Sequence, residues 1–220
     1  MADRTQTAPE TYRGHTHQTV WNERLVAGGA GTEALAGLAA VVLTILALTD
    51  ILSQTMTAIA AIVLGGGLLV EASAVAARWR SLHQMTGGGR DEAMLGGGMS
   101  AEMIAGAGGV ALGVLALIGI VPDTLLAVAS IALGAALVLG SGTQQSLSPM
   151  GWDSSPVPQQ VAQAGAGGEL LVGLAGVTLG VLALVLAMPM LTTIGLLTVG
   201  AGMFLGGSTL FARIGTAMNR

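Results

Sequence analysis

The stretch that decides the fold is GVALGVLALIGIVPDTLLAVASIALGAALVLG, residues 109–140, in which Asp123 is the only charged residue. Small and aliphatic residues flank the turn VPD on both sides. Extended outward, the apolar runs cover about 101–120 and 124–141, and a helix needs roughly 17–25 such residues to cross a bilayer. The runs lack the alternation with period two that a membrane β-barrel requires. This stretch therefore predicts a transmembrane helical hairpin.

Four further apolar runs lie near residues 33–49, 54–77, 168–187 and 190–212. The 220-residue chain is 52% hydrophobic and 9% charged, whereas soluble domains carry about 25% charged residues. Too few polar groups are present to cover a soluble surface. We predict an all-α polytopic membrane protein with six transmembrane helices, arranged as three tandem helical-hairpin repeats.

The hairpins are copies of one unit. Residues 33–71 align without a gap on residues 102–140, which places Glu33 on Glu102. The third copy starts at Glu169, and Pro122 matches Pro189, after which one residue is missing. A period of about 68 residues in three copies indicates internal repetition.

This alignment divides the chain into hairpins and polar connectors. We expect a polar N-terminal tail at 1–27, hairpins at 28–79, 96–142 and 165–214, a Gly-rich loop at 80–95, a Ser/Pro/Gln-rich loop at 143–164, and a C-terminal tail at 215–220.

All eight basic residues are arginine, and all fall on one predicted side of the membrane, in the two tails and the two longer loops. Positive residues mark the cytoplasmic side. We therefore expect a multi-pass protein of the inner (cytoplasmic) membrane with both termini in the cytoplasm and the three short turns facing outward.

Small residues recur on one face of each helix. In lipid, such residues let helix backbones approach closely. This pattern predicts packing inside the monomer, with an oligomer seam or an ion path as the alternative. The glycines concerned are Gly37, Gly106, Gly109, Gly113, Gly173, Gly176, Gly180, Gly202 and Gly206.

The segments GVALGVLALIGIVPDTLLAVASIALGAALVLG and GVTLGVLALVLAMPMLTTIGLLTVGAGMFLGG, together with the N-terminal tail, resemble the HdeD-like acid-resistance membrane protein family. The resemblance covers about residues 30–213, and the first hairpin departs from it by lacking the turn proline. It implies an inner-membrane protein tied to acid stress, and it supplies no catalytic residues.

Glu33, Glu102 and Glu169 each follow a Gly-rich segment at the start of an apolar run. One interpretation makes them helix-start carboxylates, favoured by the positive end of the helix, with Thr32 and Ser100 as N-caps. The other is a pseudo-threefold ring of carboxylates that gathers protons or cations, with the helix ends at Arg78 and Arg213 as possible partners.

Glu71 lies inside the second apolar run, about seven residues before Arg78. An ionised side chain at that depth is costly, and alignment with Gly140 and Gly206 places it on the small packing face. We expect a carboxyl group that is neutral or hydrogen-bonded near neutral pH. It is either a polar clasp between helices or a proton-sensitive site.

No arrangement of side chains indicates an enzyme, a cofactor or a nucleic-acid partner. The chain has no cysteine, and His15 and His17 are too few ligands for a selective zinc site. The expected partners are the lipid bilayer and either further copies of the chain or another membrane subunit. We expect a non-enzymatic structural or acid-stress protein, with a small proton, ion or solute channel or transporter that uses Glu71 as the alternative.

The predicted topology can be tested with single cysteines, because the chain has none of its own. In intact cells an impermeant thiol reagent should label Asp123→Cys, which lies in a turn, and should leave Ser148→Cys unlabelled. The reverse labelling pattern would show that the orientation is wrong.

Overall fold

The structure is a computed structural model that describes residues 31–50, 52–86, 92–146 and 156–218. Side chains are described within 31–50, 52–73, 101–141 and 167–208. The predicted N-terminal tail, with His15 and His17, and the three arginines that precede residue 31 lie outside these ranges.

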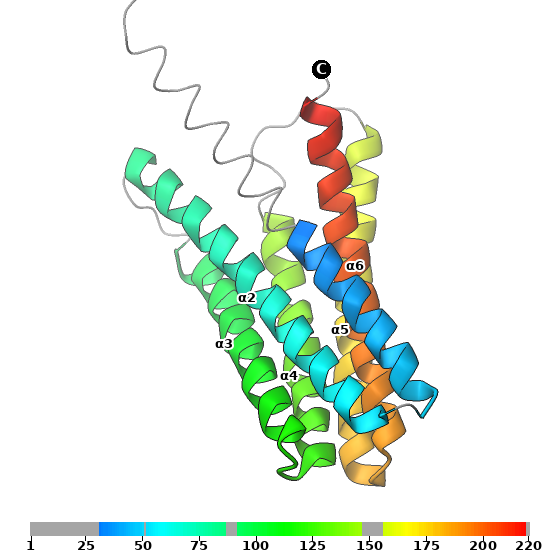
Figure 1. Cartoon of the computed structure of the whole chain (residues 1–220). Helices are drawn as coiled ribbons and strands as arrows, with labels where there is room; N and C mark the ends of the chain where they lie inside the picture. Colours follow the sequence, from blue (N-terminus) through cyan, green and yellow to red (C-terminus); the bar gives the residue numbers. More distant parts are fainter. Residues whose placement is uncertain (1–30, 51, 87–91, 147–155, 219–220) are drawn as a thin grey trace, which may run out of the picture.

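Six helices make up the described chain, which contains no strand. A first helix, Gly31–Leu48, precedes five others (Figure 1). These are α2 (Ser53–Thr86), α3 (Glu92–Leu117), α4 (Pro122–Ser146), α5 (Pro156–Leu186) and α6 (Pro189–Met218). The predicted all-α class with three consecutive hairpins is confirmed.

Five segments of these helices are long and apolar enough to cross a membrane: Gly31–Leu48, Ser53–Ser73, Pro122–Ser141, Gly167–Leu186 and Pro189–Ser208. The apolar part of α3, Ala101–Leu117, is shorter. Length and composition therefore identify an integral, multi-pass membrane protein.

Two of the predicted connectors are shorter than expected. Helix α2 continues to Thr86 and α3 begins at Glu92, within the predicted loop 80–95. Helix α5 begins at Pro156, within the predicted loop 143–164. Glycine weakens a helix by only about 1 kcal/mol per residue, which lets α3 include Gly96, Gly97 and Gly98. Proline is tolerated in the first turn of a helix, which lets α5 begin at Pro156.

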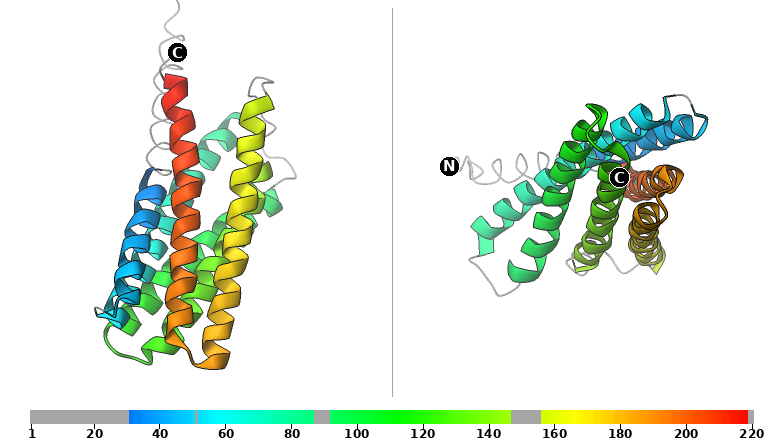
Figure 2. Two further views of the ribbon diagram at one scale, coloured as in Figure 1. Left: turned by 90° about the vertical axis from the view of Figure 1, so that its right-hand side faces the viewer. Right: turned by 90° about the horizontal axis from the view of Figure 1, so that it is seen from below.

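The second helices of the three hairpins form the centre of the bundle. Helices α2, α4 and α6 all contact one another. Helix α3 packs against both α2 and α4, and α5 packs against both α4 and α6. The first helix lies between α6 and α2, since Gly37 faces Gly200 and Ala36 faces Gly67. The three outer helices thus lie in the grooves between the three inner helices (Figures 1 and 2).

Each outer helix crosses the inner helix of the preceding hairpin at a pair of glycines. A Cβ atom added at Gly65 of α2 would lie 2.6 Å from the carbonyl oxygen of Gly106 in α3. One added at Gly134 of α4 would lie 2.7 Å from the Gly173 oxygen in α5. One added at Gly37 would lie 2.6 Å from the Gly200 oxygen in α6. The three equivalent crossings close the bundle on itself with pseudo-threefold symmetry.

The other glycines predicted to pack also lie against neighbouring helices of the same chain. Added Cβ atoms there would meet Leu133 at Gly109, Ile62 at Gly113, Val199 at Gly176, Ile131 at Gly180, Val172 at Gly202 and Glu169 at Gly206. These contacts support the reading in which the small faces pack within the monomer.

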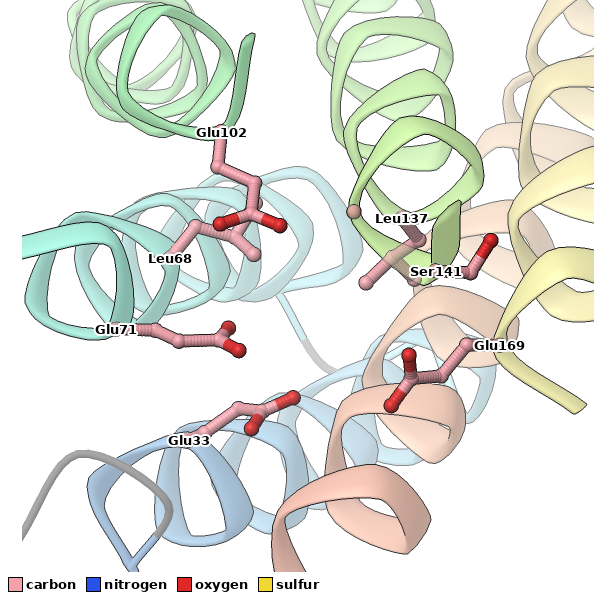
Figure 3. A pocket seen from close by; sticks show the side chains of 8 residues that line it. Glu33, Leu68, Glu71, Glu102, Leu137, Ser141 and Glu169 are labelled. Atoms are coloured by element: carbon pink, nitrogen blue, oxygen red, sulfur yellow. The ribbon is translucent and has the colours of Figure 1, made fainter. Parts of the chain in front are cut away.

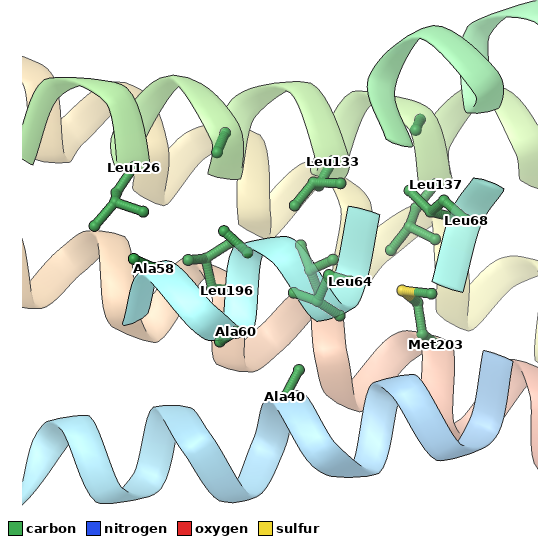
Figure 4. Packing of buried hydrophobic residues seen from close by; sticks show 14 of the residues in the cluster. Ala40, Ala58, Ala60, Leu64, Leu68, Leu126, Leu133, Leu137, Leu196 and Met203 are labelled. Carbon is green, nitrogen blue, oxygen red and sulfur yellow. The ribbon is translucent and has the colours of Figure 1, made fainter. Parts of the chain in front are cut away.

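The core is built from layers of equivalent side chains on the inner helices (Figure 4). Leu64 and Leu133 form one layer with Val199 of α6, and Leu68 and Leu137 form the next with Met203; all six are buried. Between α4 and α5, the buried Ser130 hydroxyl donates a hydrogen bond of 3.1 Å to the Gly176 carbonyl oxygen.

The outer surface is apolar and follows the repeat. Leu35, Ile104 and Leu171 occupy equivalent positions on the three outer helices and are 69%, 73% and 68% exposed. Large apolar side chains that face outward suit contact with lipid chains.

The glycine crossings can be tested with two neighbouring residues. Gly65→Ala should lower the melting temperature in detergent, because its Cβ would sit within 2.6 Å of the Gly106 backbone, and overpacking costs about 1–3 kcal/mol. Gly66→Ala should change little, because no atom lies within 4 Å of its Cβ position. Equal melting temperatures for the two variants would contradict the close crossing.

Candidate functional site

Four glutamates from four helices point into one small cavity near the end of the bundle opposite the hairpin turns (Figure 3). We call Glu33, Glu71, Glu102 and Glu169 the carboxyl cluster. Leu68, Leu137, Gly140 and Ser141 complete the wall, and the cavity measures about 10 Å³. A space of that size holds about one water molecule.

The glycine crossings orient three of these carboxyl groups toward the axis of the bundle. Glu33 lies one helical turn before Gly37, and the same spacing separates the other two glutamates from their crossing glycines, Gly106 and Gly173. Residues four apart share one face of a helix. The contact that buries each glycine therefore turns the preceding glutamate toward the axis of the bundle.

The fourth carboxyl group occupies a place that belongs to glycine in the other repeats. A Cβ added at Gly140 would collide with the Glu102 carboxyl group, and one added at Gly206 would collide with that of Glu169. In the first repeat the equivalent residue is Glu71, which faces the cavity together with Glu33 (Figure 3). Two hairpins contribute one carboxyl group each, and the first contributes two.

Three side chains of the cluster are buried, Glu71 is partly exposed, and one oxygen atom lacks a hydrogen-bond partner. Glu33, Glu102 and Glu169 are 1%, 7% and 5% exposed, and Oε2 of Glu33 is buried without a hydrogen-bond partner. A buried carboxylate is strongly disfavoured unless a cation or hydrogen-bond donors compensate it. No basic side chain lines the cavity within the described residues. Four ionised carboxylates around one such cavity would repel one another strongly.

The geometry separates the two interpretations of the outer-helix glutamates. Helix α3 begins at Glu92 and α5 at Pro156, so Glu102 and Glu169 lie well inside their helices. The helix-start interpretation is therefore wrong for both. It stays untested for Glu33, because the residues before Gly31 are not described. The structure instead brings all three glutamates together.

The Ser100 cap is wrong for the same reason, because Ser100 lies inside α3. The suggested pairing with Arg78 and Arg213 stays untested, because their side chains are not described. The sequence pattern did not predict that Glu71 lies beside the other three glutamates. The alignment of Glu71 with Gly140 could have predicted this neighbourhood, because it places all four carboxyl groups at one level of the bundle.

The cluster does not have the arrangement of a metal centre. Where side chains are described, no three His, Asp or Glu residues are placed so that they could hold one metal ion. The four carboxyl groups face the same space, and this arrangement allows them to share protons.

Comparison with known proteins adds no further information about this site. We found no match to the chain among protein-family models, curated proteins or solved structures.

The contact between each carboxyl group and its glycine can be tested by a double-mutant cycle. Gly140→Ala should destabilise the protein by about 1 kcal/mol, because the Glu102 carboxyl group must move aside. Combining it with Glu102→Ala should remove that loss, since coupled residues deviate from additivity by about 0.5–3 kcal/mol. Gly108→Ala, with open space at its Cβ position, is the control. Strict additivity would show that the two residues do not meet.

Proposed function

We propose that this protein is a non-enzymatic, proton-binding protein of the inner membrane that responds to acid. The carboxyl cluster is the proton site. The observation that carries the proposal is the buried and unpartnered Oε2 atom of Glu33 inside a cavity that three other carboxyl groups share.

Protons fit this cavity better than larger ions do. A proton added to one carboxyl group removes a buried charge and also supplies a donor for a neighbouring oxygen. A cavity of about 10 Å³ leaves no room for the water that hydrated cations carry, and the side chains are not placed as ligands of one metal ion. Ionisable groups inside a membrane protein commonly mark a proton relay or ion pathway.

The position of the cluster along the chain agrees with a role in acid stress. The arginine distribution predicts that the helix ends beyond Glu71 and before Glu102 face the cytoplasm. In that orientation the cluster lies on the cytoplasmic half of the bilayer, where acidification of the cytoplasm would reach it. The resemblance to the HdeD-like acid-resistance proteins points to the same stress.

A channel or transporter that uses Glu71 is the second candidate. Such a protein needs a polar path through the bundle, and two layers of buried apolar side chains, with Leu64 and Leu68 on α2, cross the axis next to the cluster. The described conformation is closed at these layers. It therefore favours a site that binds protons over one that conducts them freely.

Infrared difference spectroscopy in lipid nanodiscs tests the proton site directly. At neutral pH the wild-type protein should show the stretching band of protonated carboxyl groups. Glu33→Gln and Glu71→Gln should each remove part of it, because glutamine keeps the shape of the side chain but cannot titrate. Asp123→Asn, exposed in the first turn of α4, should leave the band unchanged.

The same samples supply a second measurement. If the folded protein holds protons that the unfolded chain releases, its melting temperature should rise on acidification from neutral pH, and the Gln variants should flatten that rise. A wild-type spectrum with only ionised carboxylates at neutral pH would overturn the proposed function.

A further inference from the structure

A second polar pocket lies among the inner helices at the end of the bundle that carries the hairpin turns. It measures about 40 Å³, enough for a few water molecules. We call it the turn-end pocket. It is lined by Ser53, Gln54, Thr57, Asp123, Leu126, Pro189, Thr192 and Thr193.

The pocket has an open rim and a buried floor. Gln54, Asp123 and Pro189 are exposed at the rim. Thr57, Thr192 and Thr193 on the floor are 3%, 2% and 6% exposed. The polar groups therefore continue from the outer end of the bundle into its interior.

One hydroxyl group on the floor lacks a partner. Thr57 and Thr193 share a hydrogen bond of 3.2 Å between their hydroxyl oxygens, which ties α2 to α6. The Thr192 hydroxyl oxygen is buried and has no hydrogen-bond partner. A buried hydroxyl group without a partner costs about 1–3 kcal/mol, and ordered water in a polar cavity usually supplies the missing bond.

The turn-end pocket and the cavity of the carboxyl cluster lie near opposite ends of the inner helices. On α2, Thr57 precedes Glu71 by about 14 residues, or ~21 Å of helix. The same separation joins Thr192 to Gly206 on α6, beside the Glu169 carboxyl group.

Buried side chains fill the interior between the two sites. Next to the turn-end pocket these include Leu126, Ser130 and Leu196, and two apolar layers follow toward the cluster. The first contains Leu64, Leu133 and Val199, and the second contains Leu68, Leu137 and Met203, all of them buried. The four leucines and Met203 are shown in Figure 4. Leu68 and Leu137 also line the cavity of the carboxyl cluster. Apolar constrictions of this kind close membrane pores by excluding water.

We propose that the turn-end pocket is a water-binding vestibule and that the two leucine layers form a closed gate between it and the carboxyl cluster. Together they make one axial route for protons. Water in the vestibule hydrogen-bonds the Thr192 hydroxyl group and ends at the buried side chains of Leu126 and Leu196. A proton passes from the vestibule to the cluster only when the layers separate and water bridges them. This inference rests on the proposed function, because the cluster is the acceptor at the end of the route.

Cysteine accessibility tests the vestibule in the otherwise cysteine-free wild-type chain. Thr193→Cys should react with a small water-soluble thiol reagent added on the turn side. Leu133→Cys, beyond the proposed water, should not react. A Thr193→Cys that is as inert as Leu133→Cys would show that the pocket is dry and would overturn the vestibule.

Proton flux into liposomes loaded with a pH-sensitive dye tests the gate. Leu133→Ala should raise the flux at least about tenfold over the wild-type protein, which corresponds to about 1.4 kcal/mol less barrier. Leu139→Ala, on the exposed side of the same helix, is the matched control and should change nothing. Adding Thr192→Val, which removes the hydroxyl group and keeps the shape, should lower the raised flux.

Glu71→Gln in the Leu133→Ala background tests whether the added flux passes through the carboxyl cluster. A flux that is unchanged by both Thr192→Val and Glu71→Gln would be a leak outside the proposed route, and it would overturn the inference. The same holds if Leu133→Ala folds, as judged by its melting curve, and shows no added flux. In both cases the infrared bands of the protonated carboxyl groups decide the proposed function separately.

If Leu133→Ala does not fold, Leu64→Ala repeats the measurement on the facing side of the same layer. Failure of both variants to fold leaves Thr193→Cys as the deciding result, because that variant leaves the layers intact.

Discussion

The close approach of backbones at three glycine pairs is the contact on which the rest of the bundle depends. At each crossing a single added Cβ would lie within 2.8 Å of a carbonyl oxygen on the facing helix. Helices in lipid associate through close packing and not through a hydrophobic force. The crossings therefore hold each outer helix to its inner neighbour, and they also set its rotation. That rotation turns Glu33, Glu102 and Glu169 away from lipid and toward one another.

Placing four carboxyl groups around one cavity, three of them on buried side chains, costs free energy that packing alone does not return. A fold selected only for stability would replace them with apolar side chains, since buried polar clusters often cost more than well-packed hydrophobic ones. The cost is lowered when the cluster binds protons, which connects the packing of the bundle to acidity. The apolar layers of Leu64 and Leu68 keep that site apart from the hydroxyl groups at the turn end. The described part of the bundle therefore has two polar regions separated by an apolar centre.

The first hairpin departs from the symmetry of the repeat in the residues that line the cavity. Its inner helix carries Glu71 where α4 and α6 carry Gly140 and Gly206, and these glycines make space for the Glu102 and Glu169 carboxyl groups. The extra carboxyl group therefore fits only because the cavity is shared by all three repeats. The repeats supply the scaffold, and the first copy adds one more carboxyl group to the shared cavity.

The sequence by itself determined the membrane class, the three hairpins, the repeat and the small faces of the helices. Each of these is a local property: a run of apolar residues either matches the bilayer thickness or does not, and spacing along one helix fixes one face. Only the tertiary structure decided that Gly106 meets Gly65 and Gly173 meets Gly134. It also decided that Glu102 and Glu169 lie inside their helices, and that Thr192 and Asp123 border one pocket. These facts depend on which helices lie side by side and on how each is rotated. The same sequence pattern is compatible with several ways of pairing the small helix faces, whereas the packed bundle has only one.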